Sequence, residues 1–174
     1  MTVVDDEQVN DEHVNYDPYD LALNTDPYPA LRRLREEAPL YYNARYDFYA
    51  LSRFDDVNEA LVDHRTFSSS RGVILELIKA DISAILLLVG AANRDQRQFP
   101  PDGDVFDIHR AARSHLAFGV GAHYCLGSAL ARLEGRIALD EVLTRFPEWE
   151  IDLANASLSS TAAVRGWDAL PARV

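Results

Sequence analysis

The sequence has one cysteine, no excess of basic residues and no apolar run long enough to cross a membrane. A single cysteine excludes an intramolecular disulfide and favours a reducing, cytoplasmic setting. Lysine and arginine total 17 against 28 acidic residues, and the formal net charge of −11 leaves no basic surface for nucleic acid. The longest apolar run, residues 82–92, is about half of the ~20 residues that a membrane span needs. We therefore expect neither nucleic acid nor a membrane as a partner.

The composition is that of a soluble globular protein. The chain has 174 residues, of which 48% are hydrophobic and 26% charged, and this length suits one domain. Residues 1–15 are acidic and polar, with neither the basic nor the apolar segment of a signal peptide. They predict a disordered acidic tail.

Residues 16–80 predict a helix, a β-hairpin and a second helix. Asp26-Pro27 is typical of a helix start, and the apolar positions that follow have helical spacing up to Pro39. Residues 40–53 are rich in aromatic residues and contain a turn-like stretch, which indicates a β-hairpin. Phe54 then begins another amphipathic helical pattern.

Residues 81–174 form the second predicted segment. The apolar run at 82–92 predicts a buried strand or core element. Residues 93–110 are rich in Pro, Gly, Asp and Asn without any period, so they predict a long irregular loop. Residues 126–146 carry leucines and isoleucine at helical steps and predict the longest helix, and the tail after them predicts a closing β-hairpin.

The lone cysteine lies in a glycine-rich stretch, FGVGAHYCLG, at residues 118–127. A thiolate binds metals, and the N-terminus of the helix that follows Cys125 favours negative charge. Gly119 and Gly121 let the backbone turn sharply and bring N–H groups near the sulfur. These features suit a metal-bearing ligand held by one thiolate.

Three further residues of this stretch fit a flat ligand. Gly127 leaves the first helical turn without a side chain, where such a ligand can lie against it. His123 can donate to a carboxylate at the edge of the ligand, and Phe118 can shield the sulfur from water. The structural alternative is that Cys125 is a buried, unreactive thiol, which is the more common role of a free cysteine.

Two other functional interpretations of this stretch, a dinucleotide-binding loop and a cysteine hydrolase, are rejected. A dinucleotide-binding loop needs a third glycine where this chain has Tyr124. A cysteine hydrolase needs a base that the fold brings to the nucleophile, and His123 is too close to Cys125 in sequence for that role. The remaining histidines share no metal-ligand spacing and are expected to be solvated or packed: His13, His64, His109 and His115.

The pattern Phe-Gly-x-Gly-x-His-x-Cys-x-Gly at residues 118–127 resembles the haem-binding signature of the cytochromes P450 at every defining position. The resemblance extends over about residues 16–174 and is closest to the soluble bacterial members. The other stretches that carry it are residues 16–20, 51–55, 66–69, 92–95, 106–110, 115–118 and 129–134.

This resemblance implies a mainly α fold with small β-sheets (α+β), a partial cytochrome P450-like fold. It implies haem b (iron protoporphyrin IX) as cofactor, with Cys125 as the axial ligand to the iron and His123 at a haem propionate. Phe118 is then expected beside the sulfur. A thiolate ligand pushes electron density onto the iron and favours O–O cleavage. The family reaction is a monooxygenation: one atom of O2 enters a small organic substrate, with electrons from a ferredoxin-type partner.

The chain also departs from the family, and it is identified as an internally truncated member. Near residues 79–83 it passes directly from the family's early segment to the strand before its meander. No acid–alcohol pair and no Glu-x-x-Arg pair is found, and Val105 stands where many members have arginine. The alternative function is therefore a catalytically inactive remnant, at most a haem-binding or interaction module.

Arg132 and Arg136 lie four residues apart, on one face of the predicted helix. A solvated helix face is the simple interpretation, and a docking patch for an acidic redox protein is the functional one.

Overall fold

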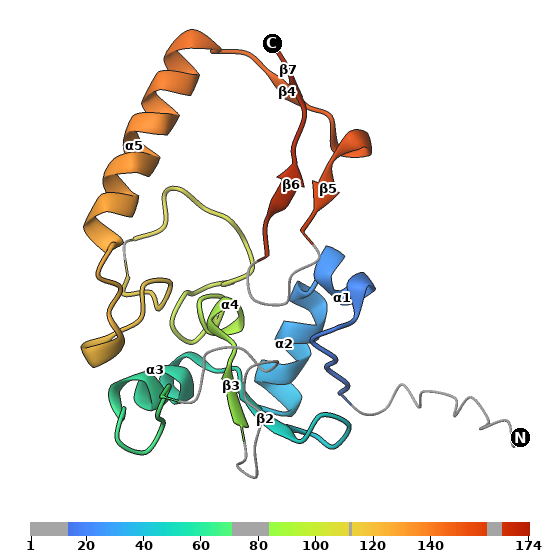
Figure 1. Ribbon diagram of the computed structural model, residues 1–174, viewed down its shortest axis with the longest axis vertical. Helices are drawn as coiled ribbons and strands as arrows, with labels where there is room; N and C mark the ends of the chain where they lie inside the picture. Colours follow the sequence, from blue (N-terminus) through green and yellow to red (C-terminus); the bar gives the residue numbers. More distant parts are fainter. Residues whose placement is uncertain (1–13, 71–83, 112, 160–164) are drawn as a thin grey trace, which may run out of the picture.

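The computed structural model describes residues 14–70, 84–111, 113–159 and 165–174 (Figure 1). The predicted acidic tail up to residue 13 and the junction at residues 79–83 lie outside these ranges. Within them the fold is mainly helical with three small sheets, as the sequence predicts. No helix of the described ranges is both long and apolar enough to cross a bilayer.

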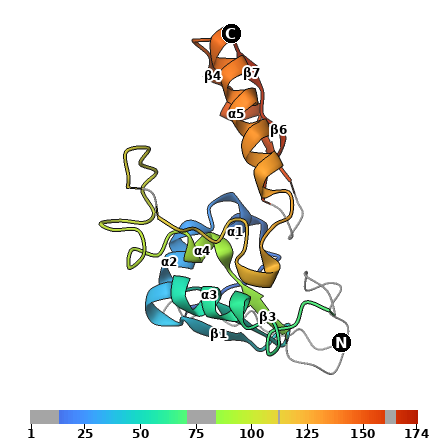
Figure 2. The ribbon, with the colours of Figure 1, turned by 90° about the vertical axis from the view of Figure 1, so that its left-hand side faces the viewer.

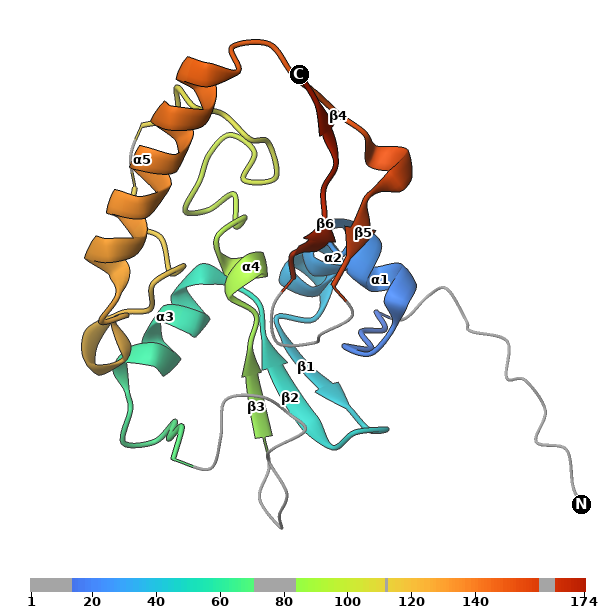
Figure 3. The same cartoon turned by 45° about the horizontal axis from the view of Figure 1, so that its top comes forward.

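Three strands form the central sheet, which Figure 3 shows side by side. β1 (Leu40–Asn43) and β2 (Phe48–Leu51) form the predicted antiparallel hairpin, with Tyr42 opposite Tyr49. β3 (Ala84–Leu87) lies parallel to β2 on its other edge. The apolar run is thus a strand that continues into the short helix α4 (Val89–Ala92), whose alanines are buried in the core.

Two helices cover opposite sides of this sheet. α2 (Tyr28–Glu37) packs Leu34 against Phe48 and Ala50 of β2, while Leu51 of the same strand packs against the cluster on α3 (Phe54–Val62). This division follows from the alternation of side chains along a strand. α4 lies between the two clusters, because Ala91 belongs to the first and Ala92 to the second.

The C-terminal part projects from this base, as Figure 2 shows. α5 (Ser128–Arg145) confirms the predicted long helix, and of its residues only Ser128 is buried. The predicted closing hairpin is two short antiparallel pairs. Their strands are β4 (Glu150–Ile151) with β7 (Ala172–Arg173), and β5 (Ser157–Leu158) with β6 (Trp167–Ala169); a 3-10 turn, η3 (Leu153–Asn155), separates β4 from β5.

Arg165 fastens this C-terminal part to the N-terminal helix α1 (Leu21–Thr25). Its guanidinium donates to the carbonyl oxygens of Asn24 and Thr25, each at 2.9 Å. Carbonyl groups in the last turn of a helix lack intrahelical partners and carry partial negative charge, so a guanidinium is well suited to bind them.

The apolar side chains of α5 change sides halfway along the helix. At 100° per residue, Leu130, Leu133 and Ile137 gather on one face of the helix, whereas Leu139, Val142 and Leu143, nearer its C-terminus, gather on the opposite face. All six are exposed.

A buried carboxylate, Asp95, caps α3 from outside the helix. The residue before the helix, Arg53, offers no side-chain cap, and Oδ2 of Asp95 instead accepts the N–H of Phe54 at 3.1 Å. Its Oδ1 accepts the backbone N–H and the guanidinium of Arg97 at 3.1 and 3.0 Å. Burial alone acts to raise the pKa of Asp95, but these hydrogen bonds outweigh it and the pKa lies below its ordinary value.

Replacing Asp95 with alanine leaves the Phe54 N–H buried without an acceptor, and we expect the free energy of unfolding to fall by about 1–3 kcal/mol at pH 7. Because the folded pKa is depressed, this stability is present above the unfolded pKa of about 4 and is lost as pH falls through the folded value. Urea unfolding between pH 7 and pH 3 measures it, with Asp56→Ala in the first turn of α3 as control. A gap between Asp95→Ala and wild type that stays constant down to pH 3 would contradict this account.

Candidate functional site

The stretch around Cys125 (residues 118–127, the cysteine loop) is built on a backbone that requires glycine. Gly119 has φ +67°, and a Cβ there would lie 2.5 Å from the carbonyl oxygen of His123. Gly121 has φ +56° and begins the short 3-10 helix η2 (Gly121–His123). The N–H of Cys125 then donates to the carbonyl of Phe118 at 2.7 Å, which closes the loop. The sharp turn predicted from the glycines is present.

Cys125 is exposed at the end of this turn, three residues before α5 begins. The loop glycines shape the backbone that carries Cys125. Donation from N–H groups of the loop to a metal-bound sulfur stays a prediction. A Cβ on Gly127 would lie 3.9 Å from Sγ of Cys125, an ordinary contact. That Cβ would meet no other atom within 4 Å outside its chain neighbours, so the position of a side chain at Gly127 is unfilled.

Phe118 and Tyr124 are linked to α5 by one arginine. The guanidinium of Arg132 lies 4.6 Å from the centre of the Phe118 ring, a cation–π distance, and donates to the Tyr124 hydroxyl at 3.1 Å. The hydrogen bond with Ser128, together with that from Arg132, holds the pKa of Tyr124 below its ordinary value. Arg132 therefore serves the loop itself, a role that its helical spacing with Arg136 did not reveal.

His123 is half-buried and lies against a second histidine from the end of α3. The His64 and His123 rings are 6.4 Å apart and nearly perpendicular. The loop also approaches the backbone of α3, because a Cβ on Gly121 would come within 3.9 Å of Cα of Val62. Sequence reasoning expected His64 to be solvated or packed. No local pattern could pair it with a residue 59 positions away.

The donor set around Cys125 restricts the kind of metal that the loop can hold. Among residues that the structure describes, no group of three or more His, Cys, Asp or Glu side chains could hold an ion. A single thiolate is too few ligands for a bare zinc or similar ion, which takes three or four protein ligands. One exposed cysteine beside an open helix turn fits a metal whose other ligands come from a flat macrocycle.

Comparisons with known proteins agree with this reading. The family model "Cytochrome P450" matches residues 53–160. Cytochrome P450 130 of Mycobacterium tuberculosis is 44% identical over 90 residues, which are 52% of this chain and 22% of that protein. The 6-deoxyerythronolide B hydroxylase of Saccharopolyspora erythraea is 45% identical over 94 residues, 53% of this chain and 23% of the hydroxylase.

Among solved structures, a cytochrome P450 from the archaeon Picrophilus torridus is 43% identical. The match covers 49% of this chain and 25% of that one, with a TM-score of 0.46. The chain spans about a fifth of the length of the curated relatives that it matches.

Replacing Arg132 with glutamine removes a hydrogen bond and a positive charge that favour the Tyr124 phenolate. We expect the pKa of Tyr124 to rise toward its ordinary value of about 10. An NMR titration of the chain with ¹³C-labelled tyrosine rings measures this shift. Arg136→Gln, one turn further along α5, is the matched control and leaves the titration of Tyr124 unchanged. An unaltered Tyr124 titration in Arg132→Gln disproves the link.

Proposed function

The chain belongs to the cytochrome P450 family, and from that premise we propose that it binds haem b through the thiolate of Cys125. Haem is the cofactor of this family. The observation that carries the proposal is the exposed cysteine at the start of α5, next to an open helix turn. The residues proposed to surround the haem are those of the matching signature: Phe118, Gly119, Gly121, His123 and Gly127.

Each of these residues has a physical task in the proposed site. Cys125 supplies the axial ligand, and Gly127 leaves room for a flat ring against α5. The guanidinium of Arg132 lies over the Phe118 ring, and Phe118 is proposed to limit water access to the sulfur when haem is bound. His123 is proposed to donate to a propionate from its half-buried position beside His64. When bound, a thiolate-ligated haem supplies an electron-rich iron for oxygen chemistry.

The proposed family activity is monooxygenation of a small organic substrate. One oxygen atom of O2 enters the substrate, and the other leaves as water with two protons and two electrons. We assign the electrons to a ferredoxin-type donor. The hydroxylase from Saccharopolyspora erythraea supports this class of reaction, since it is 45% identical over the matched residues.

A second candidate function is haem binding without turnover, as a remnant of the family fold. One observation favours it. Among the described residues, both Cys125 and the apolar side chains of the helix that follows it are exposed.

Haem added to the purified chain, reduced and treated with carbon monoxide, is expected to show the strongly red-shifted Soret band of thiolate ligation. Cys125→Ser is expected to lose that band, because a hydroxyl does not replace the thiolate as an axial ligand. Ala122→Ser, in the same loop, introduces the same hydroxyl away from the sulfur and keeps the band. If the wild-type chain in excess haem shows no red-shifted band, the chain does not form the site.

A turnover assay distinguishes a monooxygenase from a haem-binding remnant. With ferredoxin, its reductase, NADPH and 6-deoxyerythronolide B, after which one relative is named, we expect the haem-loaded remnant to oxidise no more substrate than Cys125→Ser does. Mass spectrometry after incubation under ¹⁸O2 measures labelled product. Sustained incorporation of ¹⁸O into the product that depends on Cys125 overturns the remnant hypothesis and shows that the chain is a monooxygenase.

A further inference from the structure

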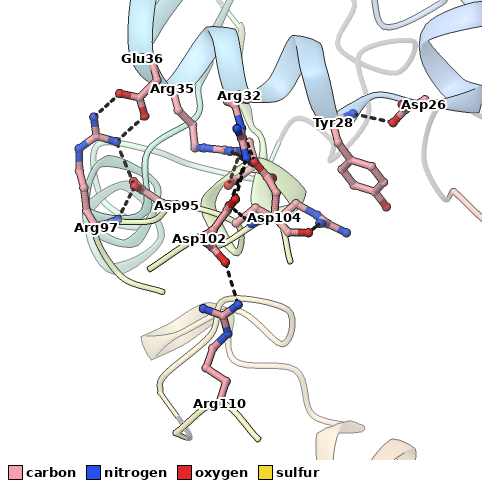
Figure 4. Close-up of polar contacts among 12 residues, drawn as sticks. Asp26, Tyr28, Arg32, Arg35, Glu36, Asp95, Arg97, Asp102, Asp104 and Arg110 are labelled. Carbon is pink, nitrogen blue, oxygen red and sulfur yellow. Dashed lines mark hydrogen bonds and ion pairs between the residues drawn. The ribbon is translucent and has the colours of Figure 1, made fainter. Parts of the chain in front are cut away.

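A network of charged side chains joins α2 to the loop of residues 93–110, and Figure 4 shows its members. Arg35 is only 2% exposed, and its guanidinium donates to both carboxylate oxygens of Asp104 at 3.1 and 3.3 Å and to the carbonyl of Ala91 at 3.1 Å. Arg32, on the same helix, donates to Asp104 at 2.6 Å and to Asp102 at 3.1 Å. A charge buried as deeply as Arg35 is tolerated only when it is paired.

The loop that these arginines bind is held together by its own contacts. Gly103 approaches Arg94 so closely that a Cβ would lie 2.1 Å from the Arg94 carbonyl oxygen. Arg94 in turn donates to the carbonyl of Asp104 at 2.9 Å. The guanidinium of Arg110 donates to four carbonyl oxygens of the loop, each at 2.8 to 2.9 Å: Phe99, Pro100, Asp102 and Val105. A displacement of Asp104 therefore moves the whole turn.

The same loop is attached to the lead-in of the cysteine loop. Oδ1 of Asn93 accepts the N–H of Leu116 at 2.7 Å, and the side chain of Gln98 donates to the carbonyl of Ser114 at 3.2 Å. Phe99 and Leu116 are buried in one apolar cluster. The carbonyl of Leu116 then accepts the N–H of Gly119 at 2.9 Å, and Gly119 lies within the cysteine loop.

We propose that Arg35 and Asp104 are positioning residues for the cysteine loop. The clamp, defined as Arg32, Arg35 and Asp104, fixes the loop of residues 93–110 on α2, and that loop fixes Leu116 and the turn at Gly119. Neither arginine touches the cysteine. The clamp acts through Asn93, Phe99 and Leu116, and its consequence for haem uptake rests on the function proposed above.

Removing the carboxylate of Asp104 leaves the buried Arg35 charge with a single carbonyl partner. Water must then enter between α2 and the loop to solvate it. When α2 separates from the loop, the hydrogen bond between Asn93 and Leu116 weakens. The hydrogen bonds that pair β1 with β2 remain. The expected effect is local to residues 93–125.

Amide hydrogen exchange of the ¹⁵N-labelled, haem-free full chain tests the proposal. In Asp104→Asn we expect the Leu116, Gly119 and Cys125 amides to exchange about tenfold faster or more, while amides of β2 keep their rates. Asp104→Glu restores the charge and is expected to recover most of the protection. Glu37→Gln, which removes a carboxylate from a pair within α2, is the matched control and leaves all rates unchanged.

Two outcomes overturn the clamp. One is exchange at Leu116, Gly119 and Cys125 within about twofold of wild type in a folded Asp104→Asn variant. The other is a loss of protection that is equal in β2 and is not recovered by Asp104→Glu. If Asp104→Asn does not fold, Arg32→Gln decides: it removes only the half-exposed member, and faster exchange confined to the same three amides supports the clamp, whereas unchanged rates refute it.

Haem titration of the same variants adds a readout that is independent of the first. We expect Asp104→Asn to weaken haem affinity several-fold and Asp104→Glu to restore it, with the Soret position reporting whether the thiolate still binds. Failure of the wild-type chain to take up haem refutes the proposed function and leaves the exchange result to decide the clamp.

Discussion

β3 pairs in parallel with β2, and this pairing positions α4, which follows β3 directly. It brings the start of α4 to the seam between α2 and α3, with Ala91 facing one helix and Ala92 the other. Two adjacent small residues thereby let α2 and α3 each approach the sheet from its own side. The carbonyl of Ala91 is left pointing at Arg35, and Asn93 at the lead-in of the cysteine loop.

The local elements could be read from the sequence because their causes are local. The aromatic-rich stretch and the turn within it predict the hairpin at residues 40–53, and leucine spacing predicts the helix that became α5. The glycines at 119 and 121 predict a tight turn, and both residues have positive φ. Family membership could also be inferred, because the ten-residue signature fixes residue types at several positions at once.

The contacts between segments could not be predicted in the same way. Asp95 caps a helix that begins 41 residues earlier, and Arg35 pairs with Asp104, which lies 69 residues later in the sequence. Each partner alone is an ordinary charged residue in a chain that is 26% charged, so no local pattern marks it. The parallel pairing of β2 and β3 contributes to bringing these partners together, and a parallel pair needs a long connection that leaves no turn signal.

The projecting helix α5 has a consequence for how molecules of this protein behave toward one another. Its two apolar faces point in opposite directions, so one molecule presents apolar side chains on two sides. The net charge of −11 opposes this by long-range repulsion. Repulsion of that kind reaches about 30 Å at 0.01 M salt but only about 3 Å at 1 M. Rising ionic strength therefore weakens the repulsion that keeps the apolar faces of neighbouring molecules apart.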